Sequence, residues 1–226
     1  MSYWARFLPL SNRDRSAEGD AIGAWATPAS ELLEGIAAVL DARPDLLSAA
    51  TLRPEVTVGA DVRDLLTRLG SPWYVRWARA WGALPTPSPA VAAIDGLALP
   101  SALRARAQAW AAPGARVSIR DLGLVVAVAL DLGATHKAEL AVDPLVCGAI
   151  ALDLALRSRL PQRSVVTARS LVATDGEWRV GRGPELASTG AAIVLFLAGR
   201  AGVPDEITPE VSPENSPDAE HGSALG

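Results

Sequence analysis

The chain has 226 residues, half of them hydrophobic, with a formal net charge of −4 and one cysteine. A single cysteine excludes an intramolecular disulfide and a zinc site built from several cysteines. Six acidic residues after Val203 account for the negative charge. The remainder is nearly neutral and lacks basic clusters, so it offers no electrostatic basis for binding nucleic acid.

The first segment, residues 1–26, is an N-terminal extension without the long apolar run of a signal peptide. The most apolar stretches elsewhere are far shorter than the ~20 residues that cross a bilayer. We therefore expect a cytoplasmic protein with no membrane partner.

Apolar residues at helical spacing then predict two helices. Residues 27–44 offer Thr27 as N-cap and Pro28 as the first helical residue, and Pro44 ends the pattern. Residues 60–70 carry four apolar side chains at helical spacing and end at a glycine.

Residues 71–82 predict a third helix, along which Trp73, Trp77 and Trp81 recur every four residues. Such a stripe indicates either core packing or an aromatic wall beside a ligand pocket. A long connection over residues 83–100 and a short helix over residues 101–110 follow.

The central helix is predicted from Ser118, which forms a capping-box pattern with Asp121, to about Leu140. Its first half is apolar nearly all round, which is typical of a buried helix. His136 lies on the same stripe as the core residues. It is either a metal ligand or a neutral histidine hydrogen-bonded inside the bundle.

A last bundle helix is predicted to begin at Asp143-Pro144 and to reach residue 160, with Cys147 as an inert apolar residue. Residues 164–183 predict two strands joined at Asp175-Gly176, and residues 188–200 predict a helix. Residues 203–226 are rich in proline and acid and predict a disordered tail, because they cannot bury enough apolar surface.

Three of these segments resemble motifs of the mycothiol-dependent maleylpyruvate isomerase family. They are VTVGADVRDLLTRLG, VSIRDLGLVVAVALDLGATHKAEL and STGAAIVLFLAGR. The resemblance spans about residues 27–202. It implies a mainly α fold, with a DinB-like four-helix bundle over residues 27–160. A small C-terminal α+β domain, a β-hairpin plus a helix, would follow over residues 161–202.

The resemblance also implies metal-assisted, thiol-dependent isomerase or transferase chemistry, with mycothiol as cofactor and zinc or another divalent metal. The chain departs from the family at two of three metal ligands: Arg68 replaces a histidine and Leu132 replaces a glutamate. His136 remains as a ligand, and Glu139, three residues later, is the second candidate. Arg200 matches the family's terminal arginine, which implies substrate handling; the alternative is a cation at a helix C-terminus.

Two functions stay open, so the sequence does not decide whether the chain is an enzyme. It is either a divergent isomerase-like enzyme or a non-catalytic bundle that binds an anionic small molecule or a partner protein. In the second case Arg68, with Trp73 and Trp77, would bind the anion in a pocket near His136. The alternative for Arg68 is a surface position whose stem covers apolar neighbours. We expect a small-molecule ligand and leave the oligomeric state open.

Overall fold

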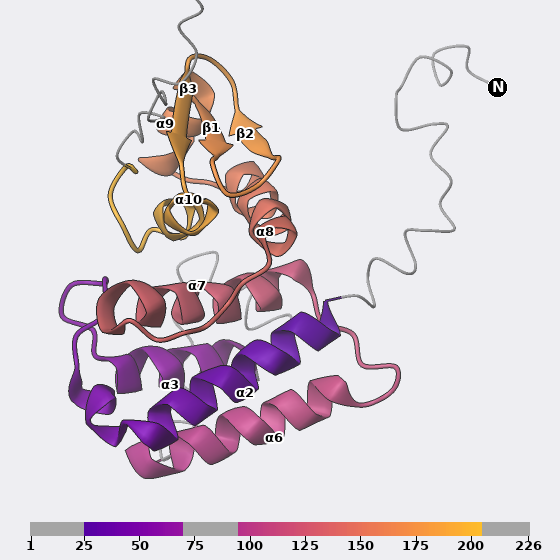
Figure 1. The fold of residues 1–226 in the computed structure, drawn as a ribbon, viewed down its shortest axis with the longest axis vertical. Helices are drawn as coiled ribbons and strands as arrows, with labels where there is room; N and C mark the ends of the chain where they lie inside the picture. Colours follow the sequence, from indigo (N-terminus) through magenta and orange to yellow (C-terminus); the bar gives the residue numbers. More distant parts are fainter. Residues whose placement is uncertain (1–24, 70–94, 205–226) are drawn as a thin grey trace, which may run out of the picture.

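The computed structural model describes residues 25–69 and 95–204, and it is mainly helical with one small sheet, as predicted. Four helices lie side by side in its lower half (Figure 1). They are α2 (Ala26–Ala42), α3 (Val58–Leu69), α6 (Leu99–Ala111) and α7 (Ile119–His136). Short 3₁₀ helices, η2 (Pro44–Ser48) and η3 (Gly96–Ala98), precede α3 and α6.

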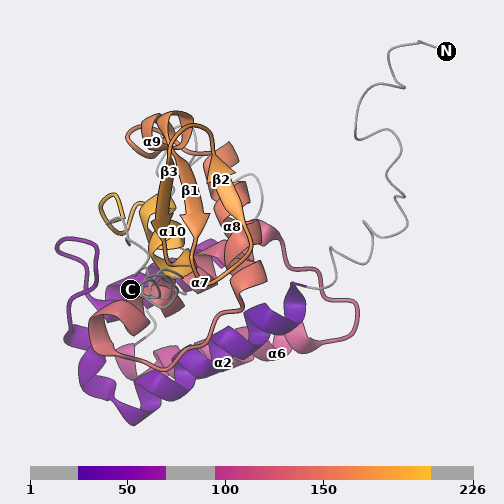
Figure 2. The same cartoon turned by 45° about the horizontal axis from the view of Figure 1, so that its top comes forward.

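The remaining elements form a second group that sits on α7 (Figures 1 and 2). They are α8 (Pro144–Leu156), α9 (Gln162–Ala168), β1 (Ser170–Ala173), β2 (Arg179–Gly181), β3 (Glu185–Ser188) and α10 (Gly190–Leu197). The strand order is β2-β1-β3. Strand β1 pairs antiparallel with β2 and parallel with β3, so Leu171 lies between Val180 and Leu186.

One hydrophobic core joins the two groups. Leu33, Ile36 and Leu40 line one face of α2, at the spacing that predicted this helix. The same core includes Leu122 of α7 and Ile193 of α10. The sheet has three short strands, and α10 lies between it and α7 (Figure 1). Packing against a helix stabilises a sheet of this size.

Side-chain caps confirm two of the predicted helix starts. A cap accepts a hydrogen bond from a backbone N–H group that has no partner inside the helix. Ser118 accepts a hydrogen bond from the backbone N–H of Asp121, and Asp143 accepts one from that of Leu145. The start of α2 differs from the prediction. Its N-cap is Trp25, so Thr27 lies within the first turn and caps nothing.

Several element bounds also differ from the sequence prediction, and the helix predicted to reach residue 160 ends at Leu156 as α8. Helix α7 ends at His136 rather than near Leu140, because Lys137 adopts a left-handed conformation with φ 52°. Residues 164–168 belong to helix α9 instead of a strand. The predicted hairpin is confirmed as the β1–β2 pair, but β3 was not predicted, since ELAS lacks the β-branched residues that indicate a strand.

The third predicted helix (residues 71–82), most of the long connection after it and nearly all of the predicted tail lie outside the described residues. Within residues 25–69 and 95–204, no helix combines the length and the apolar character needed to cross a membrane.

Candidate functional site

The most distinctive polar feature of the described fold is a buried cluster of charges centred on Arg200. Its guanidinium Nη1 donates to a carboxylate oxygen of Asp61 at 2.6 Å and to one of Asp131 at 2.8 Å. Nη2 donates to the other oxygen of Asp61 at 3.1 Å. The side chains of Arg200, Asp61 and Asp131 are 9%, 3% and 2% exposed. The three residues are contributed by three separate elements of the chain.

The local geometry after α10 directs Arg200 into this position. Gly199 follows the helix with φ +70°, a conformation that glycine adopts without steric cost. The backbone N–H of Arg200 then bonds to the carbonyl of Leu195, and that of Gly199 bonds to the carbonyl of Phe196. This closing turn reverses the chain at the helix end, so that the next side chain points back to α3 and α7.

The two carboxylates come from opposite ends of neighbouring helices. Asp61 lies in the first turn of α3, and Asp131 lies near the end of α7. Asp61 also accepts a hydrogen bond from Arg53 at 2.8 Å, and Asp131 accepts one from the backbone N–H of Leu52 at 3.0 Å. The cluster therefore links α3, α7, the segment between η2 and α3, and the end of α10.

The charges of the cluster balance. Burial alone would lower the pKa of Arg200, but hydrogen bonds and charge attraction from Asp61 and Asp131 outweigh it and raise that pKa above its usual value. Arg200 thus stays cationic at every pH at which the protein is handled. Together with Arg53, it neutralises two carboxylates that would be costly to bury unpaired.

His136 is occupied by a structural contact. Its Nε2 lies 2.9 Å from the backbone carbonyl oxygen of Ala50. Because a carbonyl oxygen only accepts hydrogen bonds, Nε2 carries the proton and donates. The backbone carbonyl of His136 accepts two bonds from the guanidinium of Arg43. These contacts attach the end of α7 to the segment around η2.

Glu139 does not share a helix face with His136, since α7 ends at His136 and Lys137 turns the chain. It is exposed and lines a groove between α2 and the connection from α7 to α8. The family's metal requires histidine and carboxylate donors that converge on one point. In the described part of the chain, no three His, Cys, Asp or Glu side chains are grouped to hold a metal ion. Residues 70–94 contain none of these four types. Within residues 25–69 and 95–204, the donors are therefore not arranged to hold the implied metal.

Arg68 lies in the last turn of α3 and pairs with Asp64, with 2.7 Å between Nη2 and the carboxylate. Since the start of α3 meets the end of α7 at Arg200, these helices run antiparallel. Arg68 lies seven residues after Asp61, which is about 10 Å along the axis of α3. Because the helices are antiparallel, this displacement leads toward the start of α7, whereas His136 is at its end. The structure does not bring Arg68 and His136 together. Trp73 and Trp77 lie outside the described residues.

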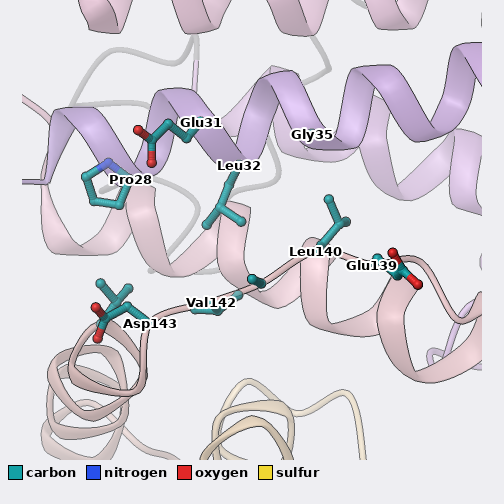
Figure 3. Close-up of a pocket in the computed structure, with 10 residues that line it drawn as sticks. Pro28, Glu31, Leu32, Gly35, Glu139, Leu140, Val142 and Asp143 are labelled. Carbon is teal, nitrogen blue, oxygen red and sulfur yellow. The ribbon is translucent and has the colours of Figure 1, made fainter.

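A groove runs between α2 and the connection from α7 to α8 (Figure 3). Its volume is about 350 Å³, within the usual range for small-ligand sites. In Figure 3, Leu32 reaches from α2 toward the connection and Leu140 reaches from the connection toward α2. Gly35 makes this approach possible, because a Cβ there would lie 2.8 Å from Leu140 Cδ2. The full lining is Pro28, Glu31, Leu32, Gly35, Glu139, Leu140, Ala141, Val142, Asp143 and Val146.

The groove has an apolar floor and an acidic rim. Its charged lining residues are Glu31, Glu139 and Asp143. The carboxylate of Asp143 caps α8, whereas Glu31 and Glu139 are exposed. Neither of these glutamates forms an ion pair with an Arg or Lys of residues 25–69 or 95–204. A positively charged group would find uncompensated carboxylates here.

The sequence predicted Arg200 as a site residue but not its two partners. A signal for both existed. Asp61 occupies an apolar-face position between Val58 and Leu65, and Asp131 interrupts the apolar run of α7 from Leu122 to Leu132. An acidic residue on the buried stripe of a helix requires a cationic partner, since burial of an unpaired charge is strongly unfavourable.

Comparison with known proteins returns no match, whether to a family model, to a curated protein or to a solved structure. The resemblance to the maleylpyruvate isomerase family therefore stays a prediction from the sequence motifs.

Proposed function

We propose that this protein is a non-catalytic, helix-bundle binding protein whose ligand is a small molecule with a cationic group and an apolar part. The observation that carries the proposal is the groove between α2 and the α7–α8 connection. It has an apolar floor and two glutamates that form no ion pair with an Arg or Lys of the described residues. The DinB-like bundle that the resemblance implies over residues 27–160 is part of this proposal, and the side-by-side arrangement of α2, α3, α6 and α7 supports it.

The choice of a binding role follows from the interior of the bundle. In a bundle enzyme, ligands from facing helices converge on a metal or substrate. Here the facing carboxylates of α3 and α7 are neutralised by Arg200, and His136 is hydrogen-bonded to Ala50. Thiol-dependent isomerase chemistry has no donor set within the described residues on which a step could be built.

The sign of the ligand's charge follows from the groove. One of the two functions left open by the sequence binds an anion at Arg68, but that guanidinium is already paired with Asp64. Glu31 and Glu139 instead attract a cation, while Leu32, Leu140 and Val142 contact an apolar chain or ring. A neutral apolar ligand would leave the carboxylates without a partner, and an anion would be repelled.

The test is binding of matched probes to the full-length protein, followed by calorimetry or by NMR shifts. Phenethylamine carries the cation, and 3-phenylpropionate has a similar shape with the opposite charge. We expect the amine to bind and the carboxylate not to bind. Glu139→Gln and Glu31→Gln should each weaken amine binding by about twofold to fivefold, as for an exposed ion pair.

Glu55→Gln is the control, because Glu55 is exposed and lies outside the groove. This variant should bind the amine as the wild type does. The proposal is wrong if both probes bind equally, or if neither glutamate variant differs from the Glu55→Gln control.

A further inference from the structure

Helix α8 exposes an unusual row of leucines. Leu145, Leu152 and Leu156 are 77%, 54% and 80% exposed, and Leu160, four residues past the last of them, is 79% exposed. Spacings of seven and four residues put the three helical leucines on one face. The opposite face is buried in the core through Val146, Cys147, Ile150 and Ala151.

Such a helix is apolar all round, which is typical of a helix buried on every side. In the fold it lies at the edge of the C-terminal group, beside β2 and α10 (Figures 1 and 2). Among the described residues, the elements packed against α8 therefore cover only one of its sides. We propose that the leucine face of α8 binds a second copy of this chain, with the two α8 helices antiparallel about a two-fold axis.

The size of the face suits a dimer. Each leucine offers roughly 100–130 Å² of apolar side-chain surface. At their exposed fractions the four offer on the order of 300–400 Å² on each copy. A standard interface covers about 800 Å² per partner, somewhat more than half of it apolar. The leucines thus supply most of the apolar part of such an interface.

The residue order also suits self-pairing. If the axis passes between residues 152 and 153, Leu156 faces Ala149 of the second copy, a large side chain opposite a small one. The two Leu152 side chains then meet at the axis. A two-fold axis repeats each of these contacts, so one row of leucines serves both copies.

The charges select the antiparallel direction and a second copy over other partners. The exposed Asp143 stands at the start of α8, and the exposed Arg159 and Arg163 follow its end. An antiparallel pair brings the start of each α8, where Asp143 stands, to the end of the other, which Arg159 follows. A parallel pair would place arginines against arginines and the two Asp143 side chains together.

Sedimentation velocity of the full chain from about 1 to 200 μM tests the proposal. We expect a dimer, and we expect Leu152→Glu or Leu156→Glu to raise its dissociation constant at least tenfold. Leu97→Glu is the matched control, because Leu97 is 74% exposed but lies in η3. This control should leave the dimer unchanged, and circular dichroism should show the same fold in all variants.

Cross-linking tests the geometry. In a Cys147→Ala background, Leu152→Cys should form an intermolecular disulfide under mild oxidation, whereas Leu97→Cys should not. A monomer at every concentration overturns the proposal, and so does a dimer that survives both glutamate variants. It is also overturned if the chain is monomeric and Leu156→Glu alone lowers the melting temperature, because the face would then be covered by the same chain.

Discussion

The guanidinium of Arg200 donates three hydrogen bonds to two buried carboxylates, those of Asp61 and Asp131. Replacing Arg200 with methionine keeps most of the apolar volume but leaves the carboxylates of Asp61 and Asp131 buried beside one remaining arginine. We expect Arg200→Met to lower the free energy of unfolding by about 3–5 kcal/mol, measured by urea denaturation.

Two comparisons separate the charge effect from loss of packing. Arg104 pairs with Glu34 and Asp41 at a partly exposed site, so Arg104→Met should cost less than about 1 kcal/mol. Adding Asp61→Asn and Asp131→Asn to Arg200→Met should restore part of the lost stability, because the uncompensated charges are gone. An Arg200→Met cost equal to that of Arg104→Met would contradict the role given to the cluster.

Cys147 predicts a pH dependence. Burial, and then the negative charges of Asp175 and Asp143, raise the pKa of its thiol from 9.0 to about 11. In the unfolded chain the thiol ionises near pH 9, whereas in the folded chain it stays protonated. Above pH 9, ionisation therefore lowers the free energy of the unfolded state relative to that of the folded state. Stability tied to this thiol is fully present below pH 9 and is lost as pH rises to about 11. The loss should be about 2–3 kcal/mol.

Urea denaturation between pH 8 and pH 11 measures this loss. The Cys147→Ala variant is the reference, since other groups titrate in the same range in both proteins. We expect the variant's stability to fall less steeply with pH. Parallel curves for the two proteins would show that the thiol ionises equally in both states.

At the scale of elements, the caps give a prediction that contrasts two threonines. Thr189 accepts a hydrogen bond from the backbone N–H of Ala192, and Asp175 accepts one from that of Gly190, so both fix the start of α10. Thr189→Ala should lower the free energy of unfolding by about 1 kcal/mol. Thr27→Ala should change it by less than about 0.5 kcal/mol, because the exposed Thr27 caps nothing. Thermal or urea unfolding of both variants checks this, and equal losses would contradict the cap assignment.

The same comparison shows what local pattern can and cannot predict. Helices α2, α3, α6, α7, α8 and α10 follow from apolar spacing and capping residues, which are properties of neighbouring residues. The end of α7 depends on the left-handed backbone of Lys137, for which the residue type gives no warning. Strand β3 forms because β1 offers it a pairing edge, and helix α9 overrides the β-branched pair Val165-Val166.

The candidate site was less predictable than the fold because its contacts are distant in the chain. Arg200 and Asp61 are 139 residues apart, and a motif that contains one says nothing about the other. The groove depends on how the connection after α7 crosses α2, so Glu31 could not be joined to Glu139 from spacing. From the sequence, the positions of Asp61 and Asp131 among buried apolar residues indicate that each needs a cationic partner. They do not identify which residue that partner is.

For the whole molecule, the continuous core predicts that the helix bundle does not fold alone. A chain ending at residue 160 would keep Asp61 and Asp131 but lose Arg200, and it would expose the side of α7 and α8 that α10 covers. Ile193, Val194 and Phe196 are buried in that core. Their loss and two buried carboxylates without their main partner together cost about as much as the stability of a typical domain, about 5–15 kcal/mol.

We therefore expect the fragment 1–160 to show helical circular dichroism without a cooperative thermal transition. The control is the fragment 1–204, which keeps every described residue and should unfold like the full chain. A sharp transition for fragment 1–160, together with dispersed NMR signals, would mean that the bundle is an independent domain. In that case Arg200 would only attach the C-terminal group to a bundle that is already folded. Arg200→Met should then lower the free energy of unfolding by less than the 3–5 kcal/mol expected above.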